Sequence, residues 1–200
     1  MSDYPVRVGF APDAGQSPLW GIPLLGAMVR SILVIPQAIV LAILGLAVSV
    51  LMLVAWIPVL LNGRMADWGY AVIGGYLRIT TRVAAYTLLL TGAYPPFGPG
   101  GDHTVSVTFD ESEQQNRLWG IPLLGLLGRA ILLIPHFVAL WLLGILVGFL
   151  GLFTWVPVLL GGRTSGWVVR WIGGYYRWTA RVGAYAMLLT GTYPPFGLED

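Results

Sequence analysis

The sequence predicts an all-α membrane protein built from two tandem helical-hairpin repeats, each preceded by a short β-strand. Three observations predict this fold class. Only 10% of the 200 residues are charged and 56% are hydrophobic, whereas a typical soluble domain is about a quarter charged. The sequence matches itself after a shift of 99 residues. Each repeat also contains an uncharged apolar run long enough to cross a bilayer.

The internal repeat is in register and has no gaps. The segment LWGIPLLG at 19–26 recurs at 118–125, and Tyr-Pro-Pro-Phe closes both repeats. We interpret this self-similarity as a tandem duplication. It divides the chain into a first membrane repeat, residues 1–98, and a second one of the same architecture, residues 99–200.

Each repeat opens with a strand and a short helix. The alternating run Val6-x-Val8-x-Phe10, which recurs at 105–109, predicts a strand. Pro23 suits the first turn of a helix that we expect to end at Ile35-Pro36. At about 1.5 Å per residue this helix is too short to span a bilayer. We therefore expect a kinked or interfacial lead-in.

Two longer helices complete each repeat. Residues 36–56 are uncharged and apolar and would span about 30 Å, which matches the bilayer core. The turn at 58–67 follows, flanked by Trp56 and Trp68, which favours a position at one membrane surface. The second long helix should run from Trp68 to about residue 90, where glycine and paired prolines end it.

We expect about four transmembrane helices, two in each repeat. Two isolated strands are marginal alone, so we expect them to pair with each other. Pairing requires both repeat starts on one membrane face, hence an even number of crossings per repeat. The alternative lays the arginine-bearing second helix flat in the interface. One crossing per repeat and inverted copies would result, with equivalent arginines on opposite faces, against the positive-inside tendency.

The motifs of both repeats resemble one family. They are Tyr-Pro-Val-x-Val at the start of the first repeat and, in both repeats, Ile-Pro-Gln or Ile-Pro-His before the apolar helix, Gly-Arg after it, Gly-Tyr-x-Arg-x-x-x-Arg-Val-x-Ala-Tyr, and Leu-Leu-Thr-x-x-Tyr-Pro-Pro-Phe. This set resembles the bacterial DUF4389 family of uncharacterised membrane proteins, twice and over nearly the whole chain. The resemblance implies a multi-pass protein of the bacterial inner membrane. It implies no activity.

Arginines form the main candidate site. All eleven basic residues are arginines, and Asp67 is the only acid within the apolar bodies. A spacing of four places side chains on one helical face, and the resulting stripes are Arg78, Arg82 and Tyr86 in the first repeat and Arg177, Arg181 and Tyr185 in the second. Arg170 extends the second stripe by two turns. An arginine at membrane depth needs a partner. We predict that the stripes bind phosphates of anionic lipid headgroups. The alternatives are bonds to carbonyls where helices pack, snorkelling, or a path for a permeant anion.

Other side chains indicate anchoring rather than chemistry. We interpret six aligned tryptophans as interface anchors: Trp20, Trp56, Trp68, Trp119, Trp155 and Trp167. His136 has Gln37 as its counterpart, so we expect no metal site there. We expect no cofactor and no enzymatic activity, because there is no cysteine nucleophile, paired apolar carboxylate or repeated Ser-His-acid set.

These patterns predict a non-catalytic integral membrane protein, a scaffold or accessory subunit that contacts anionic lipid. Its expected partners are membrane lipids and either other proteins or further copies of itself, without nucleic acid. The alternative is a small transporter or channel for anionic or lipid-like solutes, with the two arginine stripes facing each other across a central groove.

Overall fold

The structure is a computed structural model that describes residues 4–11 and 15–199. The first repeat contains β1 (Val6–Phe10), the 3-10 helix η1 (Pro18–Gly21), α1 (Leu25–Met52), α2 (Trp56–Asn62) and α3 (Asp67–Thr87). The second contains β2 (Val105–Phe109), the 3-10 helix η2 (Arg117–Gly120), α4 (Leu124–Gly151), α5 (Trp155–Gly161), α6 (Gly166–Val168), the π-helix η3 (Val169–Gly173) and α7 (Gly174–Ala186). The expected strand before each repeat is confirmed.

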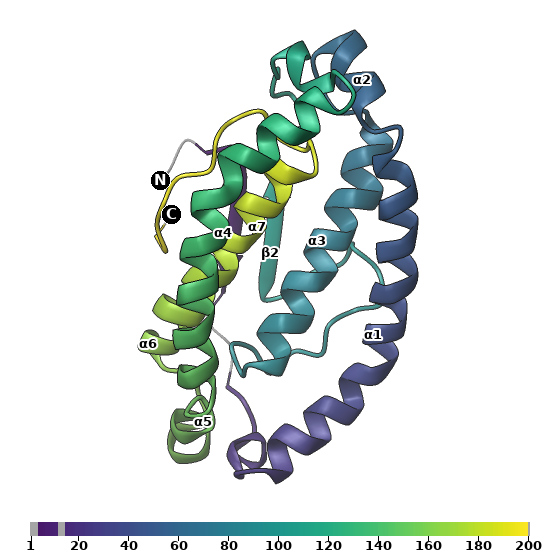
Figure 1. Cartoon of the computed structure of the whole chain (residues 1–200). Coiled ribbons are helices and arrows are strands. Elements are labelled where there is room, and N and C mark those ends of the chain that lie inside the picture. The colour runs from purple at the N-terminus through teal and green to yellow at the C-terminus, as the bar shows by residue number, and fades with distance from the viewer. Residues whose placement is uncertain (1–3, 12–14, 200) are drawn as a thin grey trace.

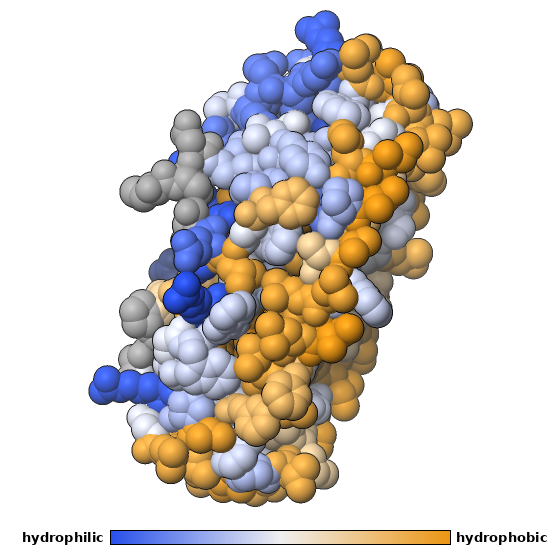
Figure 2. Space-filling view, turned by 60° about the vertical axis from the view of Figure 1, so that its left-hand side comes forward, coloured by the Kyte–Doolittle hydropathy of each residue, from blue (hydrophilic) through white to orange (hydrophobic). Residues whose placement is uncertain are grey.

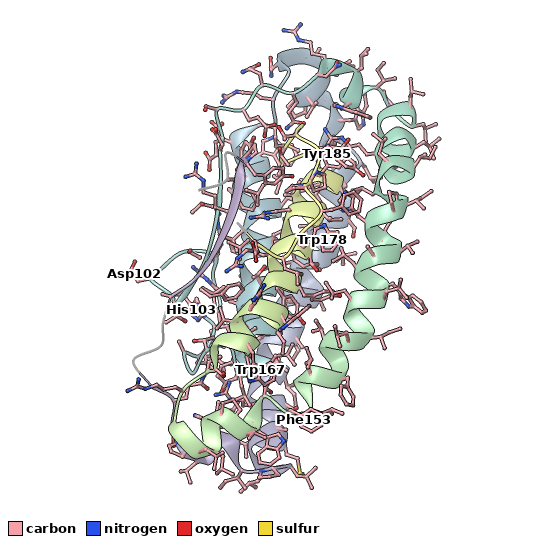
Figure 3. All side chains as sticks on the ribbon, turned by 90° about the vertical axis from the view of Figure 1, so that its left-hand side faces the viewer. Asp102, His103, Phe153, Trp167, Trp178 and Tyr185 are labelled. Carbon is pink, nitrogen blue, oxygen red and sulfur yellow. The ribbon has the colours of Figure 1, made fainter. Side chains whose placement is uncertain are left out.

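The molecule is elongated and has three layers: the two strands, the middle helices α3 and α7, and the outer helices α1 and α4. Helices α3 and α7 form the middle layer, between α1 and α4 in the view of Figure 1. Each middle helix contacts one outer helix and one strand: α3 packs on α1 and β2, and α7 packs on α4 and β1. Seen from the side, the strands lie on one side of α7 and α4 lies on the other (Figure 3).

The two strands form an antiparallel ribbon, as the pairing argument expected. Val8 pairs with Val107, its own copy 99 residues later, and the register continues with Val6 opposite Phe109 and Phe10 opposite Val105. An approximate two-fold axis therefore passes through the Val8–Val107 pair. It relates the two repeats and makes α1 and α4 run in opposite directions along the long axis (Figure 1).

The repeats interlock at both ends of the long axis. Helix η1 of the first repeat packs on α5 of the second, and η2 packs on α2. The contacts are so close that a Cβ on Gly21 would overlap the backbone nitrogen of Leu159, and one on Gly120 would overlap that of Leu60. Because each repeat lays its strand and 3-10 helix on the other, the two halves share a core.

The prediction of a separate lead-in helix before the apolar helix is wrong. Helix α1 runs without interruption from Leu25 to Met52 and contains Pro36, and α4 contains Pro135 in the same way. A proline removes one hydrogen bond and bends a helix rather than ending it when apolar sequence continues on both sides. The expected turn at 58–67 also differs, because α2 occupies its first half and ends at Asn62, where Gly63 caps it with a left-handed φ of 70°.

The second long helix differs between the repeats. Helix α3 is continuous and ends at Thr87, close to the expected end near residue 90. Its copy is divided into α6, the π-turn of η3 and α7. A π-turn accommodates one extra residue per turn and is common at functional positions. Arg170 of the predicted stripe lies in this turn.

Two helices in the described part of the chain are long and apolar enough to cross a membrane, Leu25–Met52 and the segment Leu124–Gly161. In the most apolar 18-residue stretch of each, only 11% and 22% are buried inside the protein. The core helix of a soluble protein would be mostly buried. Helices α3 and α7 do not meet the length and hydropathy test in the described residues.

Candidate functional site

The predicted arginine stripes lie against the ribbon. Arg78 donates from Nε to the carbonyl oxygen of Val107 at 3.0 Å, and Arg82 donates from Nε to that of Val105 at 3.2 Å. Arg82 also reaches the carbonyls of Pro99, Gly100 and Gly101 at 3.1–3.3 Å. These bonds join the middle helix of the first repeat to the strand of the second.

The accepting carbonyls lie on the open edges of the ribbon. Ala11 donates to Thr104 and Asp110 donates to Pro5 at its two ends. Since bonded pairs alternate in an antiparallel ladder, the carbonyls of Val8, Val105 and Val107 point away from the partner strand. A two-stranded ribbon leaves such groups unpaired. The helix arginines satisfy these three carbonyls and so dock the ribbon on α3 and α7.

The second stripe repeats this arrangement with the strand of the first repeat. Arg177 donates from Nε to the Val8 carbonyl at 3.0 Å and from Nη1 to that of Leu198 at 3.1 Å. Arg181 is buried, donates to the carbonyl of Glu199 at 2.8 Å and lies 5.7 Å from the centre of the Tyr4 ring. Four of the stripe arginines therefore bond to carbonyls where elements pack, namely Arg78, Arg82, Arg177 and Arg181.

Arg170 stands apart from the other stripe arginines. Its side chain is 71% exposed, and it lies 3.7 Å from the carboxylate of Glu199. An ion pair this exposed contributes about 1 kcal/mol at most. Arg170 also lines an open cavity of about 420 Å³, together with Trp171, Arg181 and Phe196.

The tyrosines at the ends of the stripes face a different layer. A spacing of four residues advances about 40° around a helix, so Tyr86 is turned about 80° from Arg78. Its ring packs against Arg30 of α1, whose Cζ lies 4.4 Å from the ring centre. Tyr185 packs against Arg129 of α4 at the same distance. The predicted stripes thus combine ribbon contacts and outer-helix contacts.

Arg30 and Arg129 of the outer helices are almost fully buried, each 1% exposed. Arg30 donates to the carbonyls of Tyr86 and Thr91 and to Oε1 of Gln16. Arg129 makes the equivalent bonds to Tyr185, Thr190 and Gln115. No carboxylate takes part in these six bonds.

Each of these guanidinium groups caps the C-terminal end of a middle helix by donating hydrogen bonds to carbonyls there. The last carbonyls of a helix lack intrahelical partners and carry partial negative charge. Arg30 reaches past the end of α3, where Leu89 adopts a positive φ of 61°, and Arg129 does the same at α7, where Leu188 has a φ of 64°. A buried cation is thus stabilised by carbonyl dipoles and by aromatic faces.

Sequence reasoning missed this pair. The signal available was an arginine in register in both repeats, inside an apolar run without an acid nearby. That pattern indicates a buried cation that needs carbonyl or aromatic partners. The partners themselves, 56 and 61 residues away, are brought close only by the hairpin.

Four of the six predicted anchor tryptophans lie at the two ends of the long axis. Trp20 and Trp155 belong to η1 and α5, which pack together at one end, and their copies Trp119 and Trp56 belong to η2 and α2 at the other end (Figure 1). Trp167 and Trp68 lie in the first turns of α6 and α3. Trp20 and Trp119 also cover the buried guanidinium groups, at 4.8 and 5.1 Å.

His136 is enclosed by aromatic rings. The indole Nε1 of Trp178 donates to its Nδ1 at 2.9 Å, and the ring of Phe196 stacks on it at 3.9 Å. In the first repeat Gln37 instead donates to the Pro95 carbonyl at 2.6 Å. Both side chains tie the Tyr-Pro-Pro-Phe segment to the outer helix. The described residues contain no cluster of three side chains suited to a metal.

The outer helices carry an apolar surface. Large side chains such as Ile32 and Ile43 of α1 and Ile131 and Trp141 of α4 are more than 60% exposed. Figure 2 shows this apolar side and a hydrophilic side next to it, with the boundary running along the long axis. Exposed apolar patches of this extent mark a membrane or partner surface.

One family matches the chain in comparisons with known proteins. Its description is "Domain of unknown function (DUF4389)", and it matches twice, at residues 25–98 and 124–197. The curated proteins and the solved structures give no match. Each matched segment begins in the first turn of an outer helix, α1 or α4, and ends at the Tyr-Pro-Pro-Phe segment that is hydrogen-bonded to the same helix. The chain therefore belongs to the DUF4389 family, of which it contains two tandem copies.

Proposed function

We propose that this protein is a non-catalytic integral membrane scaffold, held in the bilayer by α1 and α4. The observation that carries the proposal is the exposure of these helices, whose apolar windows are 11% and 22% buried. Apolar surface of this size is stable only in lipid or under a partner. Bacterial inner-membrane location, expected from the family resemblance, is part of this proposal.

The use of the arginines supports a structural role. Arg78, Arg82 and Arg177 fix the ribbon, while Arg30 and Arg129 close the middle helices. A transporter with two arginine stripes facing across a groove would need these groups to face each other. Arg78, Arg82 and Arg177 face the ribbon instead, so the geometry favours a scaffold over an anion path.

Four transmembrane helices, expected from the sequence, would require α3 and α7 to cross as well. Both helices carry arginines that bond to the ribbon, and the ribbon exposes polar side chains such as Arg7 and Thr108, which are costly in hydrocarbon. The geometry therefore supports embedding through the outer helices, with the ribbon side in water and available to protein partners.

Membrane fractionation tests the embedding. The double variant Ile43→Asp, Leu142→Asp adds a charge to each outer helix at an exposed apolar position, and it should leave the carbonate-resistant membrane fraction. The matched control Ser106→Asp, Thr108→Asp places the same charges on exposed ribbon positions and should stay in that fraction. Release of the control together with the outer-helix variant would contradict the proposal.

Photo-crosslinking tests the scaffold role. A photoreactive residue at Thr108 should crosslink to a protein in native membranes, whereas one at Ile43 should crosslink to lipid. The absence of any protein adduct from the ribbon side, with intact lipid adducts from Ile43, would contradict a scaffold.

Contact with anionic headgroups remains a separate prediction for the stripes. It is strongest for Arg170, which is exposed, whereas Arg82 and Arg181 are buried. Arg170→Ala should reduce the anionic lipid that copurifies with the protein, measured by mass spectrometry. Unchanged lipid in Arg170→Ala and in the double variant Arg78→Ala, Arg177→Ala would rule out headgroup binding by the stripes.

A further inference from the structure

The apolar surface extends over the whole length of both outer helices. On α1 it runs from Leu25 to Val50, and on α4 from Leu124 to Phe149. All residues of these helices are described, and their only charged side chains, Arg30 and Arg129, point inward. No polar band interrupts the surface at any height.

The same surface continues around both ends of the molecule. Leu53 before α2 and Leu61 within it are exposed, as are Leu152 before α5 and Leu160 within it. A helix that crosses a bilayer ends in polar residues at the headgroups. Here the ends of the long axis remain apolar on the side of the outer helices.

Charged groups lie instead on the ribbon side, including its middle. Figure 3 places Asp102 and His103 beside the strands, about half-way along the long axis. If this axis were the membrane normal, these residues would lie at the centre of the bilayer, where a charged side chain costs several kcal/mol. The exposed leucines at both ends would then lie in water.

Length leads to the same conclusion. Helix α1 has 28 residues, which is about 42 Å, against a hydrocarbon core of about 30 Å. A crossing along the long axis would need a strong tilt or leave about two turns outside the hydrocarbon. A helix is about 10–12 Å wide, which fits within one leaflet of about 15 Å.

We propose that α1 and α4 lie side-on in a single leaflet, so that the protein enters the membrane from one side and does not cross it. The occupant of the apolar surface is the hydrocarbon of that leaflet. The ribbon and its acidic flanks remain in the aqueous phase. This inference rests on the proposed membrane embedding and adds its orientation.

The repeat symmetry agrees with this orientation. The two-fold axis through Val8 and Val107 passes from the ribbon layer to the outer-helix layer, so it becomes the membrane normal. Equivalent residues then have equal depth. The Gly63-Arg64 and Gly162-Arg163 turns lie at opposite ends of the long axis but on the same face of the membrane, as the positive-inside tendency favours.

Single cysteines test the orientation, because the chain has none of its own. Asn62→Cys and Gly161→Cys mark the two ends, Thr108→Cys marks the ribbon, and Ile43→Cys marks the apolar surface. In vesicles of known sidedness, a membrane-impermeant maleimide should label the first three from one common side. The cysteine at 43 should react only after detergent is added.

Two labelling patterns would overturn the inference. Labelling of positions 62 and 161 from opposite sides would mean that the long axis crosses the bilayer. Labelling of 108 from the side opposite to 62 and 161 would mean two crossings per repeat. Polarised infrared spectroscopy of the unmodified protein gives an independent measure, and helix axes along the membrane normal would also overturn it.

The outcomes separate this inference from the proposed function. A protein that resists carbonate extraction but labels from both sides retains the scaffold proposal and loses the side-on orientation. A protein that carbonate releases as a soluble oligomer loses both, because a second copy would then cover the apolar surface.

Discussion

Val8 lies directly opposite Val107 in the ribbon, and the two are the same position in successive repeats. This pair is the centre of the molecule's symmetry. Each strand packs on the middle helix of the other repeat, where Arg177 and Arg78 bond to the carbonyls of Val8 and Val107. Each repeat therefore contributes its strand to the other one, so the two copies are intertwined and do not form two consecutive domains.

Crosslinking checks the strand register. Val8→Cys with Val107→Cys should form a disulfide, because non-bonded pairs in an antiparallel ladder bring Cα atoms to about 4.5 Å. The control Val8→Cys with Thr108→Cys puts the second thiol on the opposite face of the ribbon. Mass spectrometry of proteolysed, non-reduced protein identifies the link. Equal crosslinking in both pairs would contradict the register.

The buried arginines should be essential for stability. Replacing Arg129 by Met leaves the carbonyls of Tyr185 and Thr190 without their donor, at a cost of about 2 kcal/mol or more. We expect the apparent Tm in detergent to fall by roughly 4–8 °C, and Arg30→Met should act similarly.

Arg170→Met is the matched control, since its side chain is 71% exposed, and it should change stability by about 0.5 kcal/mol or less. Thermal unfolding followed by tryptophan fluorescence measures all three variants. An Arg129→Met protein as stable as the control would show that capping of the helix C-terminus by the arginine is dispensable.

The interlocked ends should not tolerate side chains at two glycines. Gly21→Val and Gly120→Val would force η1 away from Leu159 and η2 away from Leu60. Overpacking of this kind costs about 1–3 kcal/mol or more, so we expect a lower Tm and aggregation on size-exclusion chromatography. Gly161→Ala is the control, because nothing lies within 4 Å of its Cβ position. Normal behaviour of both valine variants would mean that the ends separate freely.

Alkaline pH should weaken the fold through Tyr70. Its hydroxyl donates to the Leu189 carbonyl at 3.1 Å. Burial, and then the nearby charge of Glu113, raises the pKa of this phenol to about 12. A pKa raised in the folded state adds stability below the ordinary value of about 10 and loses it as pH rises through 12. The phenolate absorbance of wild type minus Tyr70→Phe should therefore titrate near pH 12. A midpoint near 10 would contradict this.

The sequence by itself determined the features that depend on local pattern. Alternation placed the strands at Val6–Phe10 and Val105–Phe109, and self-similarity predicted two units. Helices α3 and α7 end within a few residues of the predicted positions, although leucines, Leu89 and Leu188, take the left-handed conformation that we expected of a glycine. The apolar runs identified the two helices that can enter a membrane. These signals arise from residues close together in the chain, so they need no tertiary information.

Only the tertiary structure decided which partner each element takes. A helix that is apolar on nearly all sides does not reveal which face packs, so the inward direction of Arg30 and Arg129 could not be read from spacing. The exchange of strands joins residues such as Arg177 and Val8, 169 positions apart. The orientation of the apolar surface likewise depends on how the layers stack, because the same 28-residue helix has the length to cross a bilayer or to lie within one leaflet.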